Sequence, residues 1–360
     1  MITKVIKINP SEITKKDIEI LEEVGKSIRE GEVVAFPTET VYGLGANACD
    51  DKAVRKIFEL KGRPSDNPLI VHLSSKSDIE KFAIVSNDIE KLIISNLMPG
   101  PITIILKKKP IISNITTANL DTVGIRIPYN PIAQKLIELA KVPVCAPSAN
   151  ISGKPSATDP TTVIEEFSGK IPFIIDGGRT HIGIESTVVM VKEYPSKFSI
   201  LILRPGFITK EDIEDLLSST KIQKEVEVIY AEEYSTINPL SPGQKYKHYS
   251  PKSHVVIVKN LKNIEKADIV RTFINDKIGI LGRPNFIKEV KNILNYIGAK
   301  YTVELEWCNY DLIECARNLF FAYRMFDKEN VGIILVENLE ETGIGYAIMN
   351  RVKKSSTYTI

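Results

Sequence analysis

The chain has 360 residues, of which 43% are hydrophobic and 26% charged, an ordinary composition for a globular protein with room for two domains. The formal net charge of +2 gives no overall field that favours nucleic acid or an anionic membrane. The opening residues contain no apolar core of signal-peptide length, and no apolar run approaches the ~20 residues that a membrane helix needs. We therefore expect a cytoplasmic protein with no membrane partner.

The four cysteines, Cys49, Cys145, Cys308 and Cys315, include no C-x-x-C pair. This spacing argues against a zinc ribbon and against a disulfide framework. The spacing is compatible with a reducing compartment, and we expect the cysteines to form neither a zinc ribbon nor disulfide bonds.

In chain order, a strand over 2–8 and a helix from Thr14 to Gly31 lead into a more informative stretch, residues 31–73. The apolar run 33–36 predicts a short buried strand. Three polar side chains follow it, and then two glycines that allow close or left-handed turns. They are Thr38, Glu39, Thr40, Gly43 and Gly45. A helix from about Asp51 ends in Lys61-Gly62-Arg63-Pro64, where Gly62 is predicted to follow the last turn and Pro64 blocks continuation. Residues 69–73 predict the next strand.

Hydroxyls, glycines and two cations together suit a phosphate and a small polar ligand. Each cation alone has a simpler explanation, because the helix dipole favours Lys61 at a helix C-terminus and Arg63 is typical of a solvated turn. His72, in the following strand, is more often a histidine satisfied within the structure than a ligand.

Later strands also end in polar groups. Strand 122–128 carries one cation, Arg126, in an apolar run, and a buried arginine requires a carboxylate or phosphate partner. Strand 143–146 opens into the segment 147–153, which either presents hydroxyl and amide groups to a ligand or is an ordinary loop. Strands 188–191 and 200–203 adjoin Ser186 and Arg204. The other predicted elements here are helices over 86–98, from 131, from 160 and over 209–217, and strands over 102–106 and 173–175.

Several strands that each bring one or two polar groups to a common edge can build a pocket in an α/β sheet. The sequence contains no G-x-x-x-x-G-K-[ST], so any nucleotide is held without a P-loop. It also contains no G-x-S-x-G and no H-E-x-x-H.

Residues 219–254 have weak periodicity, which predicts a linker, and we interpret them also as a lid. After them, strands alternate with helices, which predicts a smaller, mostly parallel, Rossmann-like α/β domain over 255–360. No G-x-G-x-x-G follows a strand there, so dinucleotide binding is not supported. The predicted organisation is therefore a first domain over 1–218, a linker over 219–254 and a second domain over 255–360.

Six short motifs occur in order along the first domain: PTETVYGLG, KGRPSDNPL, PGPIT, GIRIP, APSANISG and ESTVV. Together they resemble the YrdC-type threonylcarbamoyl-AMP synthases. The segment SPGQKYKHYSP and a final domain ending in GIGYAIMNR resemble the long two-domain form of that family. The resemblance covers about residues 6–355 and implies an N-terminal twisted α/β sheet with an open concave active-site face.

The resemblance also implies a reaction. The family makes L-threonylcarbamoyl-adenylate and pyrophosphate from L-threonine, bicarbonate or CO2, and ATP, with Mg²⁺ accompanying ATP. The product passes to the downstream tRNA threonylcarbamoyl-transfer machinery, which modifies tRNA next to the anticodon. A weak contact with tRNA is an additional expectation, and the Mg²⁺ ligands cannot be identified from the sequence.

By resemblance, Lys61 and Arg63 are the catalytic groups, acting electrostatically on phosphate oxygens. The expected ATP-binding residues are Lys61, Arg63, Asn67, Thr122, Ser148, Asn150, Ser156, Arg204 and Tyr246. The expected threonine-binding residues are Thr38, Thr40, His72, Arg126, Ala146 and Ser186. No protein nucleophile is required and no general base is evident, so we expect catalysis by positioning.

Three alternatives remain. The first is a double-stranded RNA or tRNA-binding module without turnover, against which the near-neutral charge and the lack of an RNP-like strand weigh. The second is the carbamoyl-transfer machinery of hydrogenase maturation, which needs zinc-finger cysteines that the spacing here does not supply. The third is a regulator that binds ATP and an amino acid without chemistry.

Overall fold

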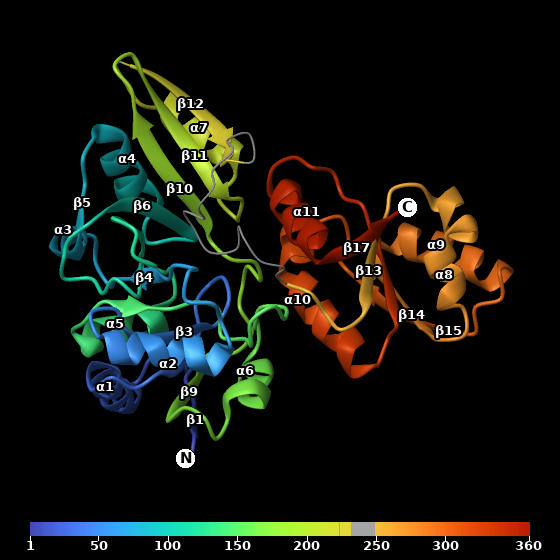
Figure 1. The fold of residues 1–360 in the computed structure, drawn as a ribbon, viewed down its shortest axis with the longest axis horizontal. Coiled ribbons are helices and arrows are strands. Elements are labelled where there is room, and N and C mark those ends of the chain that lie inside the picture. Colours follow the sequence, from blue (N-terminus) through green and yellow to red (C-terminus); the bar gives the residue numbers. More distant parts are fainter. Residues whose placement is uncertain (223, 232–248) are drawn as a thin grey trace. The chain divides into compact units, whose positions relative to one another are not determined.

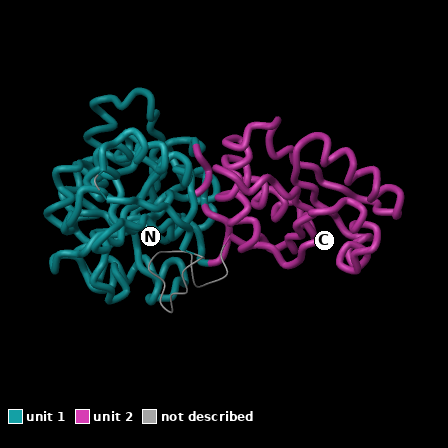
Figure 2. Tube along the Cα trace, turned by 90° about the horizontal axis from the view of Figure 1, so that it is seen from above, with its two compact units in different colours: residues 1–152, 157–181, 185–246 teal, residues 153–156, 182–184, 247–360 magenta. Residues whose placement is uncertain are grey.

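The computed structural model describes residues 1–222, 224–231 and 249–360. By their contacts the residues divide into two compact units (Figure 2). One contains residues 1–152, 157–181 and 185–246, and the other contains residues 153–156, 182–184 and 247–360. Each unit is built around one β-sheet with helices packed on it (Figure 1). Among the described helices, none combines the length and the hydropathy of a membrane span.

Twelve strands of the first unit form one mixed sheet in the order β1-β9-β2-β3-β8-β4-β7-β6-β10-β11-β12, with β5 on β6. The strands are β1 (Lys4–Lys7), β2 (Val34–Phe36), β3 (Gly43–Asn47), β4 (Ile70–His72), β5 (Ala83–Ile84), β6 (Ile102–Lys108), β7 (Thr122–Arg126), β8 (Val144–Cys145), β9 (Phe173–Asp176), β10 (Thr187–Glu193), β11 (Lys197–Arg204) and β12 (Glu225–Tyr230). The helices are α1 (Lys15–Arg29), α2 (Asp51–Lys61), α3 (Ile79–Phe82), α4 (Asp88–Leu97), α5 (Pro131–Ala140), α6 (Pro160–Phe167) and α7 (Lys210–Ser218).

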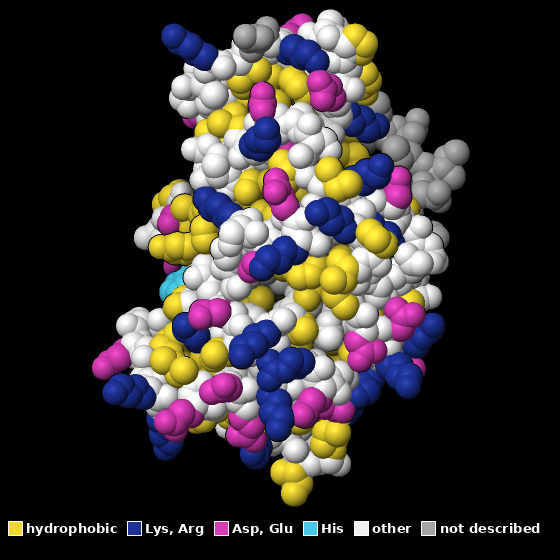
Figure 3. All heavy atoms as spheres, turned by 90° about the vertical axis from the view of Figure 1, so that its left-hand side faces the viewer, with side chains coloured by type: hydrophobic (Ala, Val, Ile, Leu, Met, Phe, Trp, Pro, Cys, Tyr) yellow, Lys and Arg dark blue, Asp and Glu magenta, His cyan; other side chains and the backbone are white. Residues whose placement is uncertain are grey.

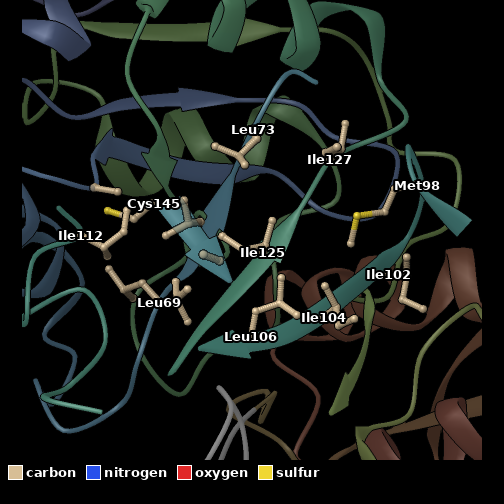
Figure 4. Close-up of a cluster of buried hydrophobic side chains, with 14 of the residues drawn as sticks. Leu69, Leu73, Met98, Ile102, Ile104, Leu106, Ile112, Ile125, Ile127 and Cys145 are labelled. Atoms are coloured by element: carbon tan, nitrogen blue, oxygen red, sulfur yellow. The ribbon is translucent and has the colours of Figure 1, made fainter. Parts of the chain in front are cut away.

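The central strands bury one face of this sheet completely. Ile102 and Ile104 of β6 and Ile125 of β7 belong to one hydrophobic cluster (Figure 4). Because side chains alternate along a strand, the intervening residues Thr103 and Arg126 lie on the other face. The sheet therefore separates an apolar core face from a face that can carry polar groups.

Helix α2 is defined at both ends by local chemistry. The Asp50 side chain accepts hydrogen bonds from the N–H groups of Lys52 and Ala53 at its N-terminus. Gly62, with φ 61°, is the left-handed C-cap that the sequence predicted. These caps fix the position of Lys61 at the last turn, where its side chain is buried.

The expectation that Gly43 and Gly45 form turns is wrong. Both lie in β3, which pairs antiparallel with β2, and neither has a positive φ. A Cβ on Gly45 would lie 2.6 Å from Cε1 of Phe36 and 2.8 Å from Cγ1 of Val144. Glycine is needed here because the Phe36 ring packs directly on the strand.

Replacing Gly45 by alanine should lower the free energy of unfolding by about 1–3 kcal/mol, because the new methyl group displaces two packed side chains. Urea denaturation would measure this loss. Phe36→Leu in the same chain makes room for the methyl group, so the double variant should lose less than the sum of the single losses. Strictly additive losses would contradict the steric explanation.

Residues 225–230, which the sequence analysis assigned to the linker, form β12 and pair in parallel with β11. This corrects the predicted boundary. The run Glu225-Val226-Glu227-Val228 alternates polar and apolar residues, the pattern of a strand with one buried face, and the assignment of this segment to a linker overlooked it. Residues 232–248, which contain much of the predicted lid and Tyr246, lie outside the described residues.

The second unit has a five-stranded parallel sheet in the order β15-β14-β16-β13-β17, which confirms the predicted small parallel α/β architecture. This order differs from the 3-2-1-4-5 order of dinucleotide-binding domains, because β16 lies between β14 and β13. The strands are β13 (His254–Val258), β14 (Lys277–Gly282), β15 (Tyr301–Glu306), β16 (Ile333–Glu337) and β17 (Ser356–Thr359). The helices are α8 (Asp268–Thr272), α9 (Pro284–Tyr296), α10 (Leu312–Lys328) and α11 (Ile344–Ser355).

The expectation that the cysteines form no disulfide is wrong for Cys308 and Cys315, which are bonded to each other. The turn from β15 into α10 brings their Cα atoms to 5.0 Å, within disulfide range. Cys49 and Cys145 are free thiols. Across the described ranges, no group of three or more His, Cys, Asp or Glu side chains is arranged to hold a metal ion.

Candidate active site

Cross-strand pairing brings several predicted site residues into one row of the first unit's sheet. His72, at the end of β4, pairs with Arg126, at the end of β7. Farther along, Thr103 of β6 pairs with Val188 of β10, which pairs with Arg204 of β11. The register of β6 on β7 brings Thr103 alongside Arg126. The row therefore places His72 and Arg126 on the adjacent strands β4 and β7, and it places Arg204 three strands beyond Arg126, on β11.

Arg126 is the centre of the first cluster in this row. Its side chain is only 5% exposed, and its Nη2 donates a hydrogen bond of 2.8 Å to Oγ1 of Thr40. The same Nη2 lies 2.8 Å from Oε1 of Glu39. Its Nε has no hydrogen-bond partner among the described residues. One edge of the guanidinium is held in place, and the unpaired Nε can bind a ligand carboxylate.

Glu39 was not selected from the sequence as a site residue. Its side chain is as buried as that of Arg126. The distance to Arg126 is that of an ion pair, yet no described residue gives either carboxylate oxygen a hydrogen bond of adequate geometry. We therefore treat the contact as electrostatic. The sequence did contain a signal that could have identified Glu39, because it is a charged residue between two threonines directly after a predicted buried strand.

Thr38 shapes the loop that carries these groups. Its hydroxyl accepts hydrogen bonds from the N–H groups of Thr40 and Val41 at 3.2 and 3.3 Å, and donates one of 2.6 Å to the Val41 carbonyl. Its Oγ1 also lies 2.9 Å from Oγ1 of Thr40. The structure thus gives Thr38 a local role in the turn that presents Thr40 to Arg126.

His72 is a neutral group in this site. Burial, followed by the nearby charge of Arg126, lowers the pKa of His72 to about 3 from its ordinary 6.5. Its Nδ1 has no hydrogen-bond partner among the described residues. His72 can therefore offer a ligand a neutral hydrogen-bonding imidazole rather than a cation.

This lowered pKa predicts a pH dependence of stability. The His72 imidazole binds a proton near pH 6.5 in the unfolded chain and only near pH 3 in the folded chain. The contribution of neutral His72 to folding stability is therefore full above pH 6.5 and falls as the pH drops towards 3. Between pH 7 and pH 5, the wild type should lose about 2 kcal/mol more than His72→Asn. Urea denaturation at each pH would measure both losses. Equal losses would contradict a neutral, buried His72.

A second cluster joins Ser186, Arg204 and Thr103. Arg204 donates from Nε and Nη2 to the Ser186 carbonyl at 3.1 and 2.9 Å, and from Nη2 to the Ser186 hydroxyl at 3.0 Å. That hydroxyl lies 2.9 Å from Oγ1 of Thr103, another residue that sequence reasoning missed. The β10–β11 register shifts between Val188 and Val189, and such bulges redirect side chains. Ser186 and Arg204, predicted for different substrates, are therefore direct neighbours.

The residues predicted to bind phosphate and ATP include a group near the start of β4 and β7. Arg63 donates to the carbonyls of Asn67 and Pro68 at 3.3–3.4 Å. The Asn67 side chain is buried, and neither its Oδ1 nor its Nδ2 has a hydrogen-bond partner among the described residues. Thr122 begins β7, at the end of the strand opposite Arg126. Arg63, Asn67 and Thr122 thus lie at the end of this strand pair opposite His72 and Arg126, whereas Arg204 lies in the same row as Arg126.

Lys61 links helix α2 to the loop over residues 146–150, which we call the APSAN loop. Its side chain is buried, and its ammonium donates hydrogen bonds of 2.5 Å to the carbonyls of Ser148 and Asn150. A buried ammonium requires such partners. The contact brings together three of the residues predicted for phosphate.

The same loop is held to the rest of the site by backbone bonds. Ala146 donates to the carbonyl of Ile70 in β4 at 2.9 Å, and Ala149 donates to the carbonyl of Tyr42 at 2.7 Å. The loop over 38–42, which contacts Arg126, therefore also contacts the APSAN loop. These bonds connect the region predicted to bind threonine with the region predicted to bind phosphate.

Two predicted ATP residues are not placed in this arrangement. Ser156 is buried, but it belongs to the segment 153–156 of the second unit. Tyr246 lies outside the described residues. The other predicted residues lie on β4, β7 and β11 or on adjoining segments of the first unit.

A buried arginine with an unpaired donor lies close to a basic, hydroxyl-rich region that contains no P-loop. This combination suits an α/β protein that holds an amino acid and a phosphorylated ligand together. Residues 26–206 match the family model described as telomere recombination, and residues 208–357 match the model of the threonylcarbamoyl-AMP synthase C-terminal domain. The chain therefore belongs to the threonylcarbamoyl-AMP synthase family, a family of enzymes.

Individual relatives agree with this assignment. The chain is 43% identical over 338 residues to the threonylcarbamoyl-AMP synthase of Pyrococcus abyssi, covering 92% of this chain and 93% of the relative. It is 39% identical to that of Bacillus subtilis, covering 91% of this chain and 90% of the relative. It is also similar to the crystal structure of P. abyssi Sua5 complexed with L-threonine, with a TM-score of 0.81, 39% identity and coverage of 99% of this chain and 100% of that chain.

Proposed function

We propose that the row around Arg126, together with the Lys61 region, carries out threonylcarbamoyl-AMP synthesis. The enzyme joins L-threonine, bicarbonate or CO2, and ATP to give L-threonylcarbamoyl-AMP and pyrophosphate. Family membership supports the reaction. The observation that carries the site assignment is the buried Arg126, whose Nε is unpaired beside Thr40 and His72.

Threonine binds at the Arg126 end in this proposal. The guanidinium takes the threonine carboxylate as a charge-assisted pair. Neutral His72 and the hydroxyls of Thr40 and Ser186 surround the rest of the amino acid. A site that pairs the substrate hydroxyl rejects valine strongly, because valine leaves buried polar groups without partners. Ala146 contributes its backbone to the same region.

ATP binds towards Lys61 and Arg63. Threonine binds as its zwitterion, and its ammonium first loses a proton to solvent. The uncharged amine then attacks CO2 and releases a second proton to solvent, and an oxygen of the resulting carbamate attacks the α-phosphorus as the bond to pyrophosphate breaks. Negative charge shifts onto phosphate oxygens, which the two cations stabilise. Ser148, Asn150, Asn67 and Thr122 supply polar contacts, with Arg204 at the boundary between the two substrates. Ser156 and Tyr246 complete the proposed ATP set.

Mg²⁺ accompanies ATP in this proposal and neutralises its phosphates. The described residues contain no cluster of three or more His, Cys, Asp or Glu side chains suited to a resident metal. That composition fits an ion held mainly by the nucleotide phosphates and water, as is common for Mg²⁺. The protein groups named above act by positioning and by charge.

We place the enzyme in the cytoplasm, where its labile product passes to the downstream machinery that modifies tRNA next to the anticodon. Lysine and arginine side chains are interspersed with acidic ones over the face in Figure 3. A mixed surface of this kind suits a weak tRNA contact better than a stable RNA-binding role.

Mass spectrometry with ¹³C-bicarbonate tests the reaction. The full mixture should give threonylcarbamoyl-AMP with one heavy carbon, and omission of ATP or threonine should abolish it. Chelation of Mg²⁺ should stop product formation, and added Mg²⁺ should restore it. Absence of the labelled adenylate from the full mixture would overturn the proposed function.

A further inference from the structure

We propose that Glu39 binds the α-ammonium group of L-threonine and makes the site selective for amino acids over the corresponding hydroxy acids. This inference rests on the proposed function, because it assigns a role within the same threonine site. It adds a specificity-determining residue to the groups discussed above.

The first argument is burial without hydrogen bonding. The Glu39 side chain is 5% exposed, and neither carboxylate oxygen has a hydrogen bond from a described residue. A buried carboxylate has four lone-pair positions to satisfy, and one ion-pair contact does not fill them. Glu39 therefore has acceptor capacity left for a cationic donor.

The second argument is position. Glu39 lies 2.8 Å from Nη2 of Arg126, whose Nε is the unpaired donor proposed for the threonine carboxylate. In any α-amino acid the carboxylate and the ammonium group are separated by one carbon atom. Adjacent opposite charges on the protein can therefore meet the adjacent opposite charges of one amino acid.

The third argument is charge balance. The Glu39–Arg126 pair is neutral as a unit, and so is a zwitterion, so their association leaves no uncompensated buried charge. An anion with a hydroxyl in place of the ammonium would add a negative charge beside Glu39. His72 cannot offset it, because burial keeps that imidazole neutral.

The test compares two ligands that share a carboxylate and a side chain. L-threonine and 2,3-dihydroxybutanoate of matching configuration differ only in the ammonium group, which is a hydroxyl in the second. Calorimetric titration of the full-length wild type should give a dissociation constant at least about tenfold lower for threonine. Glu39→Gln should weaken threonine at least about tenfold while leaving the hydroxy acid unchanged or more tightly bound.

A role limited to holding Arg126 predicts a different result, because both ligands would then weaken equally. That outcome, or full preference for threonine in Glu39→Gln, would overturn the inference. Glu90→Gln is a matched control, since it changes another buried carboxylate of the same unit, whose Oε2 accepts the Ser86 N–H. It should keep the wild-type preference.

Two further outcomes keep the test decisive. If Glu39→Gln does not fold, Glu39→Asp retains the charge at shorter reach and should keep a reduced preference for threonine; an unreduced preference would contradict the inference. If the wild type binds neither ligand, the proposed function itself fails. A wild type that binds threonine and the hydroxy acid equally well would overturn the inference and leave the proposed function standing.

Discussion

Arg126→Ala should reduce threonine-dependent pyrophosphate release by about 100-fold or more, because it removes the only group assigned to the threonine carboxylate. The loss should appear in threonine binding measured directly as well as in turnover. ATP binding should persist, since Arg63, Asn67 and Thr122 lie at the end of the β4–β7 pair opposite Arg126. Pyrophosphate release and calorimetric titration with each substrate would measure these effects.

Stability has to be separated from binding in this experiment. Arg126→Ala leaves Glu39 buried without its ion-pair partner, which should cost about 3–5 kcal/mol. Arg126→Ala/Glu39→Gln removes the stranded charge, so it should recover stability without recovering threonine binding. Arg55→Ala, an exposed change on α2, is the control. Normal threonine binding in Arg126→Ala would exclude the assigned role.

Lys61→Met should have the second large effect. The substitution keeps most of the side-chain volume and removes the ammonium that donates to the Ser148 and Asn150 carbonyls. Each buried carbonyl left without a donor costs about 1–3 kcal/mol, so the free energy of unfolding should fall. The turnover number should also fall by about 100-fold to 1,000-fold, as when a positioned electrostatic donor is removed.

The matched control is Lys52→Met, because Lys52 is exposed on the same helix. It should change neither turnover nor stability. If Lys61→Met loses stability but turns over normally at a temperature where it is folded, Lys61 only anchors the APSAN loop and is not a catalytic group.

Local chemistry made several elements predictable. The caps of α2 are short-range signals, and the sequence identified Gly62 correctly because a left-handed C-cap strongly favours glycine. The same reasoning failed at Gly45. Glycine is also selected where another side chain packs on the backbone, and the Phe36 ring responsible cannot be located from local sequence.

Two of the strands that sequence reasoning missed are edge strands, unlike β3, which lies inside its sheet. β12 ends one sheet, and β17 ends the other directly after α11. The run Glu225-Val226-Glu227-Val228 alternates as a half-buried strand does, but local sequence does not show the neighbour, β11, with which it pairs. The bonded pair Cys308–Cys315 was missed for a related reason, because only the turn from strand to helix brings the two cysteines together.

The motifs predicted the family and many of the residues around its site, but not how those residues meet. Thr40 and Arg126 are 86 positions apart, and only the register of the sheet brings them into contact. Glu39 and Thr103 were missed because each acquires its significance from a partner on another strand. The assignment of individual residues to ATP or threonine stays a prediction.

The central claim is that this sheet couples threonine binding to adenylate formation. Pyrophosphate release from ATP in the presence of bicarbonate tests it most directly, measured with L-threonine, with L-valine and without an amino acid. We expect rapid release with threonine and little release in the other two reactions. Release that is the same with and without threonine, or absent at every Mg²⁺ and salt concentration, would contradict the account.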